Sequence, residues 1–120
     1  MVRLSRIAPE LPVADLRESL AYYEQKLGFR IAMTMPDREY AIVERDDVAI
    51  HLFRDNARDC SPVGIHVFTA DLDALHAELQ QRGASVTQEI RRKPWGNRDF
   101  RVLDDSGNVI KFTEPPAENK

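Results

Sequence analysis

The tripeptide Ala14-Asp15-Leu16 stands near the start of the chain and returns as Ala70-Asp71-Leu72 in its second half. Each copy is followed by apolar residues at helical spacing and then by a glycine, Gly28 in the first half and Gly83 in the second. Strand-like runs follow each glycine. A repeated order of helix, glycine and strands is harder to obtain by chance than a repeated tripeptide. We therefore predict a chain built from two similar modules.

The first helix is predicted from about Asp15 to Leu27. Asp15 suits the N-cap, because its carboxylate can accept hydrogen bonds from the free N–H groups of the first turn, and Glu18 stands at the spacing of a capping box. The second helix is predicted from Asp71 or Asp73 to Arg82, and the glycine after each helix suits the left-handed residue that closes it. His76, at the edge of the second helix's apolar stripe, is predicted to pack rather than to act.

Strands are predicted around each helix, so that each module has the order β-α-β-β-β. We expect one α+β domain over residues 1–120, with modules at residues 5–57 and 62–114 and a flexible tail at 115–120. Pro9 and Pro12 mark the first strand as an edge or bulged strand. The strands are expected at Ile7–Val13, Ile31–Thr34, Tyr40–Glu44, Val48–Phe53, Ile65–Phe68, Ser85–Ile90, Asp99–Leu103 and Val109–Thr113.

Alternation along these strands predicts which side chains lie on the face away from the helix. Ile50 and Leu52 are expected to face the helix, so that His51 and Phe53 face away from it. The same reasoning places a mixture of aromatic and charged side chains on both helix-free faces. Two such faces curved toward each other enclose a hollow with apolar walls and a few polar groups, the usual makeup of a small-molecule site. The side chains expected there are His51, Phe53, His66, Phe68, Asp99, Arg101 and Lys111.

Composition excludes several classes of protein. Of its 120 residues 42% are hydrophobic, which makes the chain too apolar to be disordered. Its net charge of −3 gives no reason to expect a nucleic-acid partner. Its longest stretch without a charged residue, Cys60–Ala70, is far shorter than the ~18–20 residues of a membrane helix. The start of the chain lacks the apolar segment of a secretory signal, and a single cysteine allows no internal disulfide. We predict a cytoplasmic protein.

The motifs resemble one known family. In the first half they are Leu11-Pro12-Val13-Ala14-Asp15-Leu16, Tyr22-Tyr23-Glu24 and Leu27-Gly28-Phe29, and in the second half they are the runs 93–100 and 104–110. Over about Ile7 to Thr113 the chain resembles the vicinal-oxygen-chelate superfamily (glyoxalases, bleomycin-resistance proteins and extradiol dioxygenases), and most of all its bleomycin-resistance branch. The resemblance implies two modules that form a U-shaped cleft, usually completed in a homodimer. The sequence leaves open whether modules pair within one chain or across two.

The resemblance also implies where a metal would bind. Enzymes of the superfamily place ligands at four inward positions, which fall here on Ala8, His51, Gly64 and Lys111. Only His51 is a good ligand, and the cation of Lys111 repels a divalent ion. We therefore expect no metal cofactor. A displaced divalent-metal site of His51, His66 and Glu10 is kept as the alternative.

The ligand's charge is ambiguous. Arg101 and Lys111 favour a neutral or anionic ligand, whereas bleomycin-type drugs are cationic and call for acidic groups such as Asp99, Glu10 and Glu44. The run Arg91-Arg92-Lys93, with Arg98 and Arg101, forms a basic cluster that either is merely solvated or marks the mouth of the cleft. Trp95, between Pro94 and Gly96, either stacks on a planar ligand or anchors a dimer interface or lid. Phe53 and Phe68 either contact ligand or pack sheet to sheet.

The preferred hypothesis is a non-catalytic homodimer that binds a bleomycin-type antibiotic or a similar small molecule in its cleft and confers resistance by sequestration. The alternative is a metal-dependent glyoxalase or lyase-type enzyme. A structural or regulatory dimer without a ligand is the third hypothesis. No Ser–His–acid pattern indicates a nucleophile. The predicted ligand-binding residues are His51, Phe53, His66, Phe68, Trp95, Arg101 and Lys111.

Overall fold

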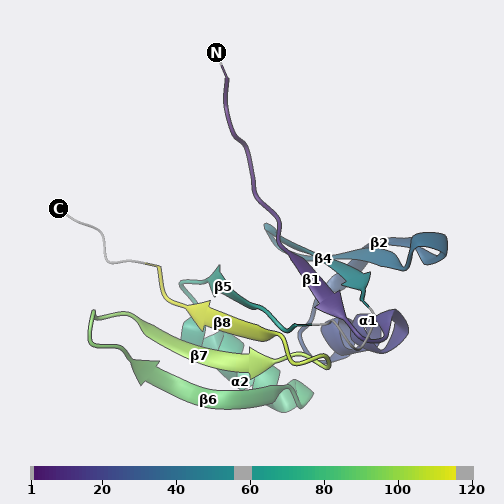
Figure 1. Ribbon diagram of the computed structural model, residues 1–120. Coiled ribbons are helices and arrows are strands. Elements are labelled where there is room, and N and C mark those ends of the chain that lie inside the picture. Colours follow the sequence, from purple (N-terminus) through teal and green to yellow (C-terminus); the bar gives the residue numbers. More distant parts are fainter. Residues whose placement is uncertain (1, 56–60, 116–120) are drawn as a thin grey trace.

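The computed structural model describes residues 2–55 and 61–115, and within them the chain forms two four-stranded sheets, each with one helix (Figure 1). The strand orders are β1-β4-β3-β2 and β5-β8-β7-β6, with β1 parallel to β4 and β5 parallel to β8. The elements are β1 (Glu10–Val13), α1 (Leu16–Gln25), β2 (Arg30–Met35), a 3-10 turn (Pro36–Arg38), β3 (Tyr40–Arg45), β4 (Val48–Arg54), β5 (Gly64–Phe68), α2 (Leu72–Arg82), β6 (Ser85–Arg92), β7 (Arg98–Leu103) and β8 (Val109–Thr113).

Both predicted helices are confirmed, and their ends follow from local chemistry. The Asp15 carboxylate accepts a hydrogen bond from the Glu18 amide at 3.0 Å, which caps α1. Gly83 closes α2 with φ +82°, a conformation that glycine adopts without a steric cost. Asp71, at the N-cap of α2, makes no such side-chain bond. The two modules therefore begin their helices differently, although the tripeptide is the same.

The first strand was predicted too long. It begins at Glu10, which lies opposite His51 of β4, and before Pro9, whose carbonyl accepts from the His51 amide at 2.9 Å, residues 2–8 pair with no strand in the described part of this chain. They run outward as an extended segment in Figure 1, which we call the N-terminal arm (residues 2–8). Ile7, expected inside the strand, is 91% exposed. Cys60 lies outside the described residues, as does all of the predicted tail except Pro115.

The predicted alternation of faces is confirmed. Ile50 and Leu52 are fully buried, whereas His51 and Phe53, on the other face of β4, are half-buried. Buried side chains of both modules form one hydrophobic cluster, which includes Tyr23 of α1. His76 packs as expected: its ring meets that of Phe100 edge-on at 5.0 Å between centroids. Among the described residues, no helix is long and apolar enough to cross a membrane.

The two modules meet at two junctions that correspond by the internal repeat. At the first, which we call the closed junction, the β7–β8 turn (residues 104–108) bonds to the first module: Ser106 Oγ accepts from the Ala14 amide (3.0 Å), and Asn108 Nδ2 donates to the Pro12 carbonyl (2.9 Å). At the second, the open junction, the short turn Asp46-Asp47 between β3 and β4 faces the start of α2.

One ion pair clamps the open junction from behind. Arg45 donates to both carboxylate oxygens of Glu78, at 2.9 and 2.7 Å, and to the Leu27 carbonyl at 2.9 Å. Arg82 adds a bond to Glu78 at 2.8 Å. Arg45 and Arg82 hold the pKa of Glu78 down at about 2. The clamp joins β3 of the first module to α2 of the second.

We expect this clamp to stabilise the protein in a pH-dependent way. Because the folded-state pKa of Glu78 lies below its usual value, the stabilisation is complete above about pH 5 and is lost as pH falls toward 2. The side chains of Arg45 and Glu78 are 27% and 34% exposed, so solvent screening limits the effect to about 1 kcal/mol. Urea unfolding of Glu78→Gln should show this loss at pH 7 and almost none near pH 2, with Glu24→Gln as the surface control. A loss that is equal at both pH values would contradict the prediction.

Candidate functional site

The helix-free face of the first sheet carries a hydrogen-bonded chain of three side chains. The Tyr40 hydroxyl donates to Glu10 Oε2 at 2.6 Å and lies 2.6 Å from His51 Nδ1. The bond to Glu10 raises the pKa of Tyr40 to about 12, so this phenol keeps its proton. With the Tyr40 proton committed to Glu10, His51 Nδ1 acts as the donor to the phenol oxygen. The chain fixes the orientation of the His51 ring.

Tyr40 was not among the predicted site residues. The sequence held a usable signal, because the alternation that places His51 on this face also places Tyr40 there: Tyr40 pairs with Phe53 across the β3–β4 register. Met33 and Ile42 pair on the neighbouring strands of the same face, and both are half-buried. This face is thus mostly apolar and aromatic, with polar groups gathered at one edge.

The helix-free face of the second sheet is basic. Neighbouring strands place Gln88, Arg101, Lys111 and His66 in one row across β6, β7, β8 and β5. Arg101 and Lys111 are directly opposite like charges, an arrangement that destabilises a sheet. Arg101 Nε is buried and has no hydrogen-bond partner in the described part of the chain. The row therefore offers unneutralised positive charge to whatever lies on this face.

Not every predicted basic or acidic group is free on this face. Lys93 and Asp99 are 8% and 4% exposed, and their charged atoms are 3.2 Å apart. Gln88 bonds to both, donating to Asp99 Oδ1 at 2.7 Å and accepting from Lys93 Nζ at 3.0 Å. Asp99 is thus neutralised inside the protein and is no counter-charge for a cationic ligand. Arg98, also counted in the basic cluster, is held by Asp73 and Glu114.

Two of the predicted aromatic residues are well exposed. Trp95 lies in the turn between β6 and β7 and is 74% exposed, and Phe68 is 57% exposed at the end of β5. The Phe68 ring stacks on His66 at 6.0 Å between centroids and 16° between planes. Large exposed rings are costly to leave in water and commonly mark a contact surface.

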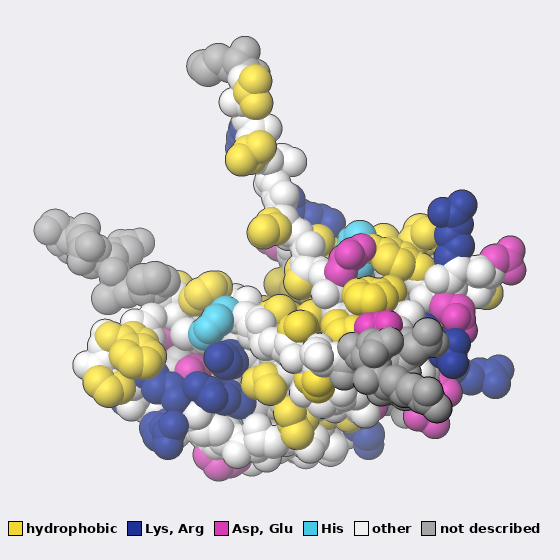
Figure 2. Space-filling model, in the orientation of Figure 1, with side chains coloured by type: hydrophobic (Ala, Val, Ile, Leu, Met, Phe, Trp, Pro, Cys, Tyr) yellow, Lys and Arg dark blue, Asp and Glu magenta, His cyan; other side chains and the backbone are white. Residues whose placement is uncertain are grey.

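The predicted site residues thus fall into two groups on separate sheets. His51 and Phe53 lie on the first sheet, and His66, Phe68, Arg101 and Lys111 on the second. Figure 2 shows basic side chains gathered over the second sheet, at lower left, and hydrophobic side chains over the first, at upper right. The two surfaces differ in charge and in polarity, as two complementary halves of a site would.

The side chains at the four inward positions decide whether a metal of the kind that the resemblance implies can bind. A Cβ placed on Gly64 would lie 4.0 Å from Lys111 Cε, so these two family positions adjoin and hold no ligating atom but an ammonium nitrogen. In the alternative set, Tyr40 links Glu10 to His51, while His66 lies on the other sheet, 3.2 Å from Thr113 Oγ1. No group of three His, Cys, Asp or Glu side chains within residues 2–55 and 61–115 forms a metal-holding cluster. These residues do not fit a metal centre, and no metal-dependent step is derived from them.

Sequence comparison relates the chain to one superfamily and to named proteins. The profile of the Glyoxalase/Bleomycin resistance protein/Dioxygenase superfamily matches residues 3–112. A bleomycin resistance protein of Geobacillus stearothermophilus is 29% identical over 124 residues, which cover 87% of this chain and 92% of that protein. A bleomycin resistance protein of Staphylococcus aureus matches to the same extent.

Solved structures confirm the predicted α+β fold of two βαβββ modules. The bleomycin resistance determinant encoded on the transposon Tn5 has a TM-score of 0.84 at 20% identity, covering 95% of this chain and 100% of that one. The bleomycin-binding protein from bleomycin-producing Streptomyces verticillus, complexed with copper(II)-bleomycin, has a TM-score of 0.78 at 27% identity, covering 97% and 100%.

Proposed function

The chain belongs to the Glyoxalase/Bleomycin resistance protein/Dioxygenase superfamily, and on that premise we propose that it binds a bleomycin-type antibiotic or a similar planar small molecule and confers resistance by sequestering it. The observation that carries the proposal is the pair of helix-free faces, which combine aromatic rings with a few oriented polar groups and hold no metal-binding set in the described residues. The similarity to the Streptomyces verticillus bleomycin-binding protein over nearly the whole chain supports it.

We propose that the site is completed by a second copy of the chain. The two halves lie on separate sheets, and pairing the first sheet of one protomer with the second sheet of its partner would set the face that carries His51 and Phe53 opposite the basic row of Arg101 and Lys111, with the ligand between them. The N-terminal arm supports an association of this kind. Its apolar residues Val2, Leu4 and Ile7 are 95%, 93% and 91% exposed, and a partner would remove them from water.

Sequestration requires no chemical step. His51, oriented by Tyr40, offers one directional hydrogen bond, while Phe53 and Phe68 supply flat apolar surfaces and Trp95 closes over a planar ring system. Binding lowers the concentration of free drug by mass action, so protection depends on affinity and on the amount of protein.

Fluorescence of the single tryptophan tests this proposal directly. Adding bleomycin or copper(II)-bleomycin to the purified protein should quench Trp95 with a dissociation constant in the micromolar range or below. Measured by calorimetry, Trp95→Ala should weaken binding by about ten- to a hundredfold, because a large stacking surface is lost. His76→Gln, on the helix side of the second sheet, is the matched control and should bind as the unmodified protein does.

Two results would contradict the proposal in different ways. Failure of bleomycin-group and other planar compounds to bind at tens of micromolar would refute the resistance function. Full ligand binding by a species that sediments at 13.8 kDa, the mass of one chain, would refute the shared site while leaving the function intact.

A further inference from the structure

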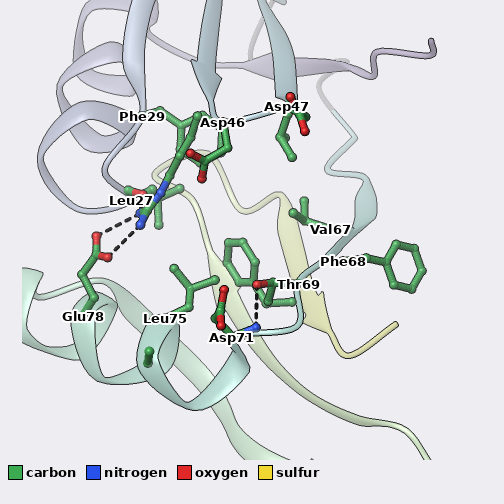
Figure 3. A pocket seen from close by; sticks show the side chains of 14 residues that line it. Leu27, Phe29, Asp46, Asp47, Val67, Phe68, Thr69, Asp71, Leu75 and Glu78 are labelled. Atoms are coloured by element: carbon green, nitrogen blue, oxygen red, sulfur yellow. Dashed lines mark hydrogen bonds and ion pairs between the residues drawn. The ribbon is translucent and has the colours of Figure 1, made fainter. Parts of the chain in front are cut away.

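A hollow lies on the helix side of the protein, where the two modules meet (Figure 3). Its volume is about 470 Å³, within the range of small-molecule sites. It is lined by the end of α1, the β3–β4 turn, the end of β5 and the first turns of α2. Of the predicted ligand-binding residues only Phe68 borders it, and the other lining residues differ from those of the helix-free faces.

The hollow exists because the internal repeat is imperfect. At the closed junction, the β7–β8 turn is long enough for its polar side chains to reach the first module and bond to it. The corresponding β3–β4 turn consists of Asp46 and Asp47 alone and extends no hydrogen bond to α2. The space that the longer turn fills at one junction is therefore left open at the other.

The floor of the hollow is apolar. Leu27 and Phe29 come from the first module, and Val67, Leu75 and Phe112 from the second. Leu27 and Phe112 are 1% and 3% exposed, so the floor is part of the continuous core and is not a mobile surface. The Phe68 side chain points away from the hollow in Figure 3.

The rim is acidic. Asp46, Asp47 and Asp71 are exposed around the opening, and the side chains of Asp47 and Asp71 have no hydrogen bond or ion pair within residues 2–55 and 61–115. The one lining cation, Arg45, is turned to the back wall, where Glu78 binds it through both carboxylate oxygens. The charge that the opening presents is thus negative, next to apolar and aromatic walls.

We propose that this inter-module hollow is a second binding site, which takes a small organic cation with an apolar or aromatic body. The cationic group, an ammonium, amidinium or guanidinium, lies among Asp46, Asp47 and Asp71; Asp46 also interacts with the charge of Arg45, so Asp47 and Asp71 supply most of the attraction. The apolar body lies over Leu27, Val67 and Leu75 and leaves water.

The probe for this site is 2-(1-naphthyl)ethylammonium, with 2-(1-naphthyl)ethanol as its neutral match. Added at millimolar concentration to the full-length protein with labelled leucine and valine methyl groups, the cation should shift the signals of Leu27, Val67 and Leu75. The alcohol should bind about three- to tenfold more weakly, and the difference should shrink at high salt, because exposed charges are screened.

Two variants separate charge from shape. Asp47→Asn with Asp71→Asn should remove the preference for the cation, whereas Asp37→Asn, an exposed carboxylate on the 3-10 turn, should not. Ala74→Trp, at an exposed position that lines the hollow, should abolish the shifts. It should leave unchanged the methyl signals of residues that do not line the hollow, such as Val102. Equal binding of cation and alcohol, shifts confined to the helix-free faces, or no shifts at all would overturn the proposal.

Discussion

Replacing Asp104 by alanine is expected to lower the free energy of unfolding by about 3–5 kcal/mol, a large part of the stability of a small domain. Asp104 is 5% exposed, and its two carboxylate oxygens accept four hydrogen bonds. Oδ1 accepts from the amides of Ser106 and Asn108, and Oδ2 from the Tyr23 hydroxyl and Asn108 Nδ2, all at 2.8 Å. Alanine would remove the acceptor of all four bonds and leave the Tyr23 hydroxyl and the Asn108 backbone amide, which both belong to buried residues, without a partner.

The effect should be large because the same carboxylate serves both modules. Tyr23, fully buried in α1, reaches across the closed junction to Asp104, and burial beside this carboxylate raises the pKa of Tyr23. Asn108, also fully buried, passes the connection on to the Pro12 carbonyl and to the Val63 amide. Loss of Asp104 therefore loosens the turn and the contact between modules together.

Urea unfolding followed by circular dichroism measures this change. Tyr23→Phe removes one of the four bonds and should cost about 1–2 kcal/mol. Asp105→Ala is the neighbouring comparison: Asp105 is exposed and accepts one hydrogen bond from Ser19 Oγ at 2.7 Å, so its loss should cost about 1–2 kcal/mol, clearly less than that of Asp104. A loss below 1 kcal/mol for Asp104→Ala would show that water satisfies the exposed donors and that the closed junction is not held in this way.

The sequence predicted the modules, both helices and the faces of the strands, because each depends on short-range patterns. The spacing of leucines, a capping aspartate and alternation along β4 are local, and Ile50 and His51 lie on the faces that alternation gives them. Ile7 was misplaced for the same reason. Its local pattern is that of a strand, but a strand also needs a neighbour, and this segment has none in the described part of the chain.

Features that depend on the partner of a side chain could not be read from the sequence. The run Arg91-Arg92-Lys93 looks uniformly basic, yet the bulged register of β6 against β7 turns Lys93 inward to Asp99, with Gln88 between them. The acidic hollow at the open junction depends on the difference in length between two turns. The reach of each turn across its junction is a property of the assembled modules.

The basic row on the second sheet should determine which ligand charge the protein prefers. Replacing both Arg101 and Lys111 by glutamine should raise the affinity for a planar cation, such as an acridinium dye or bleomycin itself, by about ten- to a hundredfold. The two residues are opposite each other on β7 and β8, and neither forms an ion pair in the part of the chain that the structure describes. A ligand on this face therefore meets two unneutralised positive charges, one of them with a buried and unpartnered Nε.

The same double variant should weaken binding of an anionic naphthalenesulfonate and should slightly stabilise the protein, because opposed like charges are removed from the sheet. Arg17→Gln with Lys26→Gln changes the net charge equally on the helix side and should leave both affinities within about twofold. Isothermal titration with both dyes, at low and high salt, separates local from long-range charge. If the Arg101 and Lys111 variant binds the two dyes as the unmodified protein does, the basic row does not face the ligand. Its positive charge must then be neutralised by an acidic group of a partner.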